Sequence, residues 1–331
     1  MKKNEKRLKI IIFAVSMITF LKNWTLPLAM LAGALGYFAY ANISLLDGTH
    51  QMANRVIAIV QPLLLFGMLL LTFCKVRPSD LRLAGWQCWL LLFQTSIYLL
   101  GAFFIYQMPE SHWTVVIEGG MLCIICPTAT AAAVVTRKLG GQVGSLTAYT
   151  IIINLAVAII VPLTVPMIHP QPGLTFFHAF LIIMSKVFPL LLGPFFLSII
   201  LRWLSPRFTE WLTAVRDLPF YLWAVSLSLA IAVSTRSIVH SHVPWTYQLA
   251  IAAISLLACI LQFAFGRRIG RQYDDPISAA QACGQKNTVL AIWMGYTFLT
   301  PITSIAGGFY SIWHNVWNSY QLYKARHSKV S

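Results

Sequence analysis

Acidic side chains are scarce in this sequence. Only nine of its 331 residues are Asp or Glu. Charged residues of both signs make up 10% of the chain, whereas soluble domains contain roughly 25%. This shortage argues against a soluble globular or disordered protein. The hydrophobic share of 58% and the mean hydropathy of +0.72 instead indicate a chain that lies largely within a membrane.

The same shortage limits the chemistry that the chain can perform. An intramembrane protease needs paired aspartates or a Ser-His pair inside its apolar runs. All nine acidic residues lie in loops or near the ends of such runs, and no Gly-x-Ser-x-Gly motif is present. We therefore expect that the chain is not an enzyme, that it binds no cofactor and that its cysteines form no disulfide framework. We interpret Cys123 and Cys126, a C-x-x-C pair inside an apolar run, as packing residues rather than metal ligands.

Long apolar runs dominate the rest of the chain. A membrane crossing needs about 20 apolar residues. Ten runs approach or exceed this length, at 25–45, 54–74, 86–107, 114–136, 143–168, 174–203, 218–235, 246–266, 276–298 and 299–322. The sequence therefore predicts an all-α polytopic membrane protein with ten transmembrane helices. Residues 25–168 form the first five-helix repeat of this prediction, and residues 174–322 form the second.

The basic residues predict how the chain is oriented. Of 24 Lys and Arg residues, 20 precede the first run, occupy every second loop or follow the last run, and only Arg55 and Arg236 lie on the other side. Such an excess marks the cytoplasmic side of a membrane protein. We predict a multi-pass protein of the bacterial inner membrane with both termini cytoplasmic. Residues 1–24 would carry an interfacial helix and residues 323–331 a tail. The net charge of +15 then reflects orientation and not nucleic-acid binding.

Two of the apolar runs are interrupted by small and polar residues, at 126–133 and at 279–288. They are the fourth and ninth runs, which correspond if the chain consists of two five-helix halves. An odd number of helices per half reverses its orientation, so the repeats would be inverted. Broken helices at matching positions are typical of the midplane binding site of a transporter. Two ordinary kinked helices that pack through small residues are the alternative.

Residues 126–150 and 287–315 resemble the two crossover regions of the bile acid:sodium symporter family. Residues 66–80 and 188–193 are also similar to patterns of that family. The resemblance implies a core domain of helices 3–5 and 8–10 and a panel domain of helices 1, 2, 6 and 7. It also implies transport of organic anions, typically with sodium, through a cavity between the two domains.

The chain departs from this family where sodium would bind. Alanines stand where the family has a Ser-Asn pair and a Glu, and a lysine replaces a Gln. Sodium requires oxygen ligands, which alanine side chains lack. We therefore expect degenerate sodium sites and transport without sodium, and a proton is the alternative coupling ion. The positions that define these sites are Ala132, Ala133, Ala282, Lys286, Gln94 and Thr150.

Lys286 is the most informative single residue. It lies ten residues after Pro276, which is about 15 Å of helix and half of the hydrocarbon thickness. An ammonium at this depth usually faces a cavity and marks a transport pathway. Lys286 could replace a bound sodium ion, attract an anionic substrate or carry a proton. A side chain that snorkels to the interface is the alternative.

Further polar residues complete the set of candidates. Glu118 is expected to be a boundary carboxylate that faces water, with pairing to a substrate or to Lys286 as the alternative. His314 and Asn315 match a family pattern but could equally be packing residues. The remaining candidate ligands are Thr128, Thr130, Asn154, Gln281, Gln285 and Asn287.

We therefore predict a secondary transporter that moves small organic anions by alternating access, with an anion and the lipid bilayer as its partners. A sodium-dependent symporter with atypical sites and an anion channel are the alternatives.

Overall fold

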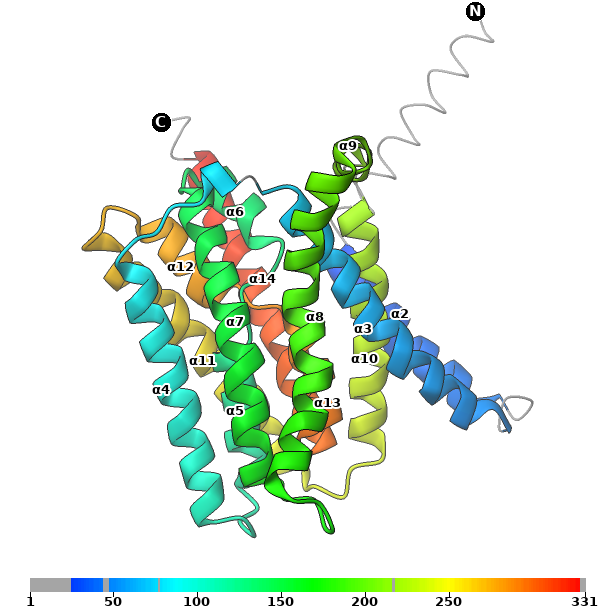
Figure 1. Ribbon diagram of the computed structural model, residues 1–331. Helices are drawn as coiled ribbons and strands as arrows, with labels where there is room; N and C mark the ends of the chain where they lie inside the picture. Colours follow the sequence, from blue (N-terminus) through cyan, green and yellow to red (C-terminus); the bar gives the residue numbers. More distant parts are fainter. Residues whose placement is uncertain (1–24, 44–47, 77, 216–217, 328–331) are drawn as a thin grey trace, which may run out of the picture.

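The computed structural model describes residues 25–43, 48–76, 78–215 and 218–327. The interfacial helix expected within residues 1–24 lies outside the described residues. Within the described ranges the chain forms thirteen α-helices and two short 3-10 helices, and no named strand. Figure 1 shows the long helices side by side.

Most of the chain is in long helices. Their apolar composition is stable in a bilayer because a helix satisfies its own backbone hydrogen bonds. Six of them are long and apolar enough to cross a membrane: Gln51–Cys74, Trp86–Gln107, Val143–Ile168, Phe176–Leu204, Tyr221–Val239 and Trp245–Arg271. They lie in α3 (His50–Cys74), α4 (Trp86–Gln107), α7 (Val143–Ile168), α8 (Phe176–Leu204), α10 (Leu218–Val239) and α11 (Trp245–Arg271). These helices indicate a multi-pass membrane protein.

The other elements are α2 (Thr25–Asn42), α5 (Thr114–Ile125), α6 (Ala132–Leu139), α9 (Pro206–Ala214), α12 (Pro276–Gly284), α13 (Thr288–Phe298) and α14 (Ser304–His327), with η2 (Pro78–Asp80) and η3 (Pro301–Thr303). The described residues thus contain more helices than the ten predicted runs. Run 114–136 is divided into α5 and α6, and run 276–298 into α12 and α13. The short helix α9 accounts for the remaining difference.

Both interruptions have a local cause. Pro127 lacks an N–H group and disfavours the helical conformation at the residue before it. Cys126 accordingly ends α5 with φ −53° and ψ 136°. In the other break, α12 ends at Gly284, and Gln285 is extended with φ −91° and ψ 96°. Asn287 then begins α13, and its Oδ1 accepts a hydrogen bond from Leu290 N at 3.2 Å. The interruptions predicted in these two runs are therefore present.

The helices pack as two neighbouring sets. In one set α10 packs against α2 and α3, and α3 packs against α8. In the other, α11 packs against α5, α12 and α14, while α4 packs against α5 and α7. The sets meet where α7 contacts α8 and where α10 contacts α13 and α14. In Figure 1, α4 and α11 lie to the left and α2, α3 and α10 to the right.

Two glycines bring α11 and α12 close together. A Cβ atom on Gly266 would lie 2.5 Å from the carbonyl oxygen of Ala279, and one on Gly270 would lie 2.5 Å from that of Asp275. Small residues permit this close approach of helix backbones in membrane proteins. The approach fixes α12, and with it the second break, against α11.

Candidate functional site

The two helix breaks pair with each other in the interior of the protein. Thr128 and Lys286 form an isolated antiparallel β-bridge. Ala129 N donates to Gln285 O, and Asn287 N donates to Pro127 O, both at 2.8 Å. Thr128 Oγ1 also donates to Ala282 O at 2.7 Å. Non-helical backbone at membrane depth is tolerated only where protein or a cavity satisfies it, and here the two breaks satisfy each other.

Side chains from other helices satisfy the carbonyl groups left free at the end of α5. Cys123 O accepts a hydrogen bond from Gln262 Nε2 at 3.1 Å. Ile124 O accepts two hydrogen bonds at 2.9 Å, from Gln94 Nε2 and from Lys286 Nζ. The structure thus brings together Gln94 and Lys286, two of the predicted site residues.

Lys286 is 1% exposed, and its ammonium lies inside the protein. The snorkelling alternative is therefore wrong, because Nζ bonds to the Ile124 carbonyl instead of reaching an interface. No carboxylate among the described residues forms an ion pair with Lys286. Its charge instead faces the C-terminal end of α5, where the helix dipole is negative.

A buried polar network connects the end of α5 to α4, α7, α11, α12 and α14. Gln94 Nε2 donates to Gln262 Oε1 at 2.9 Å, and the hydroxyl of Tyr149 donates to Gln94 Oε1. Gln262 Nε2 donates to the Tyr310 hydroxyl at 3.0 Å, and that hydroxyl donates to Gly284 O at 2.8 Å. Sequence reasoning missed Gln262, Tyr149 and Tyr310. Gln262 lies deep within the apolar run 246–266, and this position was a signal that could have identified it.

The positions matched to the sodium sites provide few free oxygen atoms. Ala132 and Ala282 are completely buried, and Ala133 is partly buried. Thr150 Oγ1 is occupied within its own helix, where it donates to Leu146 O at 3.0 Å. Asn154 Nδ2 donates to Thr150 O at 2.6 Å, whereas Asn154 Oδ1 is buried without a hydrogen-bond partner.

Glu118 does not face water, and that expectation is wrong. The residue is 0% exposed, and among the described residues it forms no ion pair with Lys286. Its Oε1 accepts hydrogen bonds from His169 Nε2 at 2.9 Å and from Thr300 Oγ1 at 3.1 Å, and its Oε2 accepts one from Thr300 N at 3.0 Å. The carboxylate therefore joins α5 to the end of α7 and to the loop after α13.

The predicted polar residues of α12 and α14 make different kinds of contact. Gln281 Nε2 donates to Asn318 Oδ1 at 2.9 Å, which connects α12 to α14. His314 is 5% exposed, and its ring packs on Tyr310 with centroids 5.6 Å apart. Asn315 Nδ2 donates to Ser311 O at 2.7 Å within the helix. Both contacts lie within α14, and His314 Nδ1 is buried without a hydrogen-bond partner, so the interhelical packing role of His314 and Asn315 stays a prediction.

Two further candidates, Thr130 and Gln285, border the paired breaks. Thr130 is half-buried at the end of the first break. Gln285 is 3% exposed, and its side-chain Oε1 is buried without a hydrogen-bond partner.

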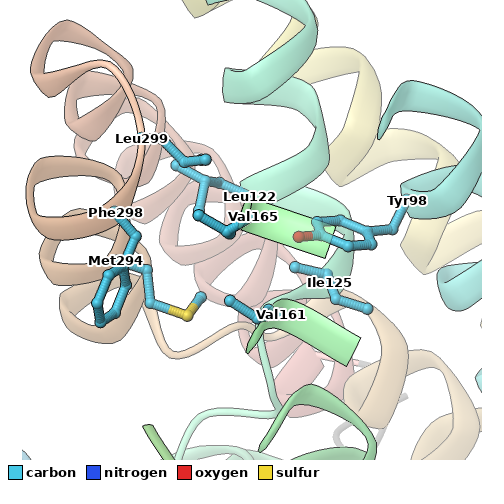
Figure 2. Close-up of a pocket in the computed structure, with 8 residues that line it drawn as sticks. All are labelled: Tyr98, Leu122, Ile125, Val161, Val165, Met294, Phe298 and Leu299. Carbon is cyan, nitrogen blue, oxygen red and sulfur yellow. The ribbon is translucent and has the colours of Figure 1, made fainter. Parts of the chain in front are cut away.

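A small apolar cavity lies between α4, α5, α7 and α13 (Figure 2). Its lining residues are Tyr98, Leu122, Ile125, Val161, Val165, Met294, Phe298 and Leu299. The volume of ≈ 10 Å³ corresponds to about one water molecule. An organic anion does not fit in it, so these helices are packed together in this conformation.

No family model matches the chain, and no characterised protein matches it in sequence. The class that the structure itself defines is an all-helical, multi-pass membrane protein. Two of its helices are broken and pair around a buried lysine.

Proposed function

We propose that this protein is a secondary transporter that carries small organic anions by alternating access, without sodium. The observation that carries the proposal is the pairing of two broken helices around Lys286, a buried cation without a carboxylate partner. Broken helices of this kind form the substrate and ion sites of secondary transporters.

The helix order supports an inverted repeat. Taken as ten crossings, α2, α3, α4, α5 with α6, and α7 make up the first half. The second half comprises α8, α10, α11, α12 with α13, and α14. The break is then the fourth crossing of each half. In this proposal α2, α3, α8 and α10 form the panel and the other crossings the core, as in the bile acid:sodium symporter family, which the sequence resembles.

Lys286 takes the role of the coupling ion in this proposal. A sodium-coupled relative would hold a cation near Gln94 and the second break, and here an ammonium is covalently tethered there. Its charge adds to the positive N-terminal ends of α6 and α13, which begin at the two breaks. Because water is excluded, the attraction for a carboxylate is stronger than at a surface.

The burial of Lys286 explains why domain movement is required. At 1% exposure the ammonium cannot touch a substrate in this conformation. An anion would bind at the surface of the paired breaks. The ammonium of Lys286 would attract it from beneath this surface, without direct contact. Movement of the panel against the core would then open this surface to each side of the membrane in turn.

Uptake into proteoliposomes tests the proposal. Mass spectrometry of small molecules that co-purify with the protein would first identify candidate anions. Saturable uptake that persists when choline replaces sodium, and that is lost in Lys286→Gln, is the expected result. Lys138→Gln is the matched control, because Lys138 is an exposed cation on α6. Unitary currents would indicate a channel instead, and a steep sodium requirement would contradict the tethered-cation role.

A further inference from the structure

One face of α11 remains exposed along the length of the helix. Leu257, Ile260 and Leu261 are 49%, 57% and 45% exposed, and Ala264 on the next turn is also exposed. Their spacing of three and four residues places them on one side of the helix. Trp245, at the start of α11, is 70% exposed. An exposed apolar strip on a helix that begins with an exposed tryptophan is typical of a surface that contacts lipid.

Three arginines continue the same strip at the other end of α11. Arg267, Arg268 and Arg271 follow Ala264 at the same three- and four-residue spacing, and all three are exposed. We refer to these three residues as the arginine face. Together with Ala264 they line an open hollow of ≈ 370 Å³. Since alanine contributes only a methyl group, space remains between the guanidinium groups for a ligand.

No residue that the structure describes forms an ion pair with the arginine face. Within the described part of the chain, none of its three guanidinium groups makes an ion pair or a side-chain hydrogen bond. Guanidinium groups bind phosphate oxygens through two parallel hydrogen bonds and are weakly hydrated. A phosphate is therefore the chemical group that this hollow fits best.

We propose that the arginine face binds the phosphate of an anionic phospholipid whose acyl chains lie along Leu257, Ile260 and Leu261. The apolar strip favours a lipid over free phosphate, because it continues from the hollow without interruption. Arg267 and Arg271 are four residues apart, about 6 Å along the helix, which fits within the depth of one headgroup region. Basic clusters at this boundary typically recognise anionic headgroups. This proposal does not depend on transport activity.

Native mass spectrometry of the full chain in a non-ionic detergent tests this site. The protein is titrated with phosphatidylglycerol and, separately, with phosphatidylcholine. Each arginine near the headgroups contributes about fivefold to the affinity for an anionic lipid. We therefore expect R267Q/R268Q/R271Q to bind phosphatidylglycerol at least tenfold more weakly, with little change for phosphatidylcholine. The single variant R268Q should lose about fivefold, and it also serves if the triple variant fails to fold.

The matched control is K75Q/R137Q/K138Q. It removes three exposed cations at helix ends that are also on the basic side of the protein. Near-normal binding of phosphatidylglycerol by this control supports a specific site, and an equal loss would overturn it in favour of general surface charge. Wild-type binding by R267Q/R268Q/R271Q would also overturn it. A third arm adds inorganic phosphate, and displacement of the lipid at comparable concentration would show that the site binds the free anion instead.

Discussion

Replacement of Lys286 by methionine should abolish transport while costing little stability. The variant loses the hydrogen bond from Nζ to Ile124 O, and a hydrogen bond of a charged group contributes about 1.5–3 kcal/mol. Ile124 O keeps its second donor, Gln94 Nε2 at 2.9 Å, so no buried carbonyl is left unpaired. No carboxylate is left unpaired either, since none of those described pairs with Lys286.

The opposing term is the burial of the ammonium, which costs several kcal/mol even after relaxation. Methionine fills a similar volume and removes that cost. The two terms nearly cancel, so the free energy of unfolding should change by less than about 2 kcal/mol. An increase in the free energy of unfolding is as consistent with these two contributions as no change.

Thermal unfolding in detergent, followed by tryptophan fluorescence, measures this change. Leu290→Ala is the reference variant, because Leu290 is fully buried on the adjacent α13 and such a truncation costs about 2–5 kcal/mol. Lys286→Met should lower the melting temperature by less than half as much. A decrease in melting temperature equal to that of Leu290→Ala would show that the lost hydrogen bond and the removed burial cost of the ammonium do not cancel. Normal anion uptake by Lys286→Met would refute the functional role of its charge.

Three further predictions concern coupling, topology and the Glu118 contacts. Initial uptake of an identified anion should remain nearly unchanged when choline replaces external sodium, and a steep dependence on sodium would contradict the site assignment. A reporter fused after Ser331 should be active in the cytoplasm, whereas reporters inserted at 109–112 and 169–173 should lie on the opposite side. Glu118→Gln should lower the stability by about 1–3 kcal/mol, because an amide cannot accept all three hydrogen bonds of the carboxylate. Melting temperatures measured beside the exposed Glu110→Gln control would reveal this loss, and equal values for the two variants would contradict it.

Local features of the chain were enough to predict much of the fold. A helix in lipid satisfies its own backbone, so the length of an apolar run predicts a membrane helix without knowledge of its neighbours. The positions of the two breaks were also predictable, because Pro127 and the small residues around Gly284 act on the adjacent backbone. The number of crossings, their inverted arrangement and their orientation stay predictions.

The partners of the polar residues were decided by the tertiary structure alone. Gln94 and Gln262 are 168 residues apart, and they meet only because α4 and α11 both pack around the end of α5. Glu118 was expected to face water, yet it is buried and accepts hydrogen bonds from Thr300, which is 182 residues away in the sequence. Hydropathy and helix-breaking residues act over a few positions along the chain. The contacts of a buried side chain depend on which distant helices pack around it, and that arrangement is a property of the whole fold.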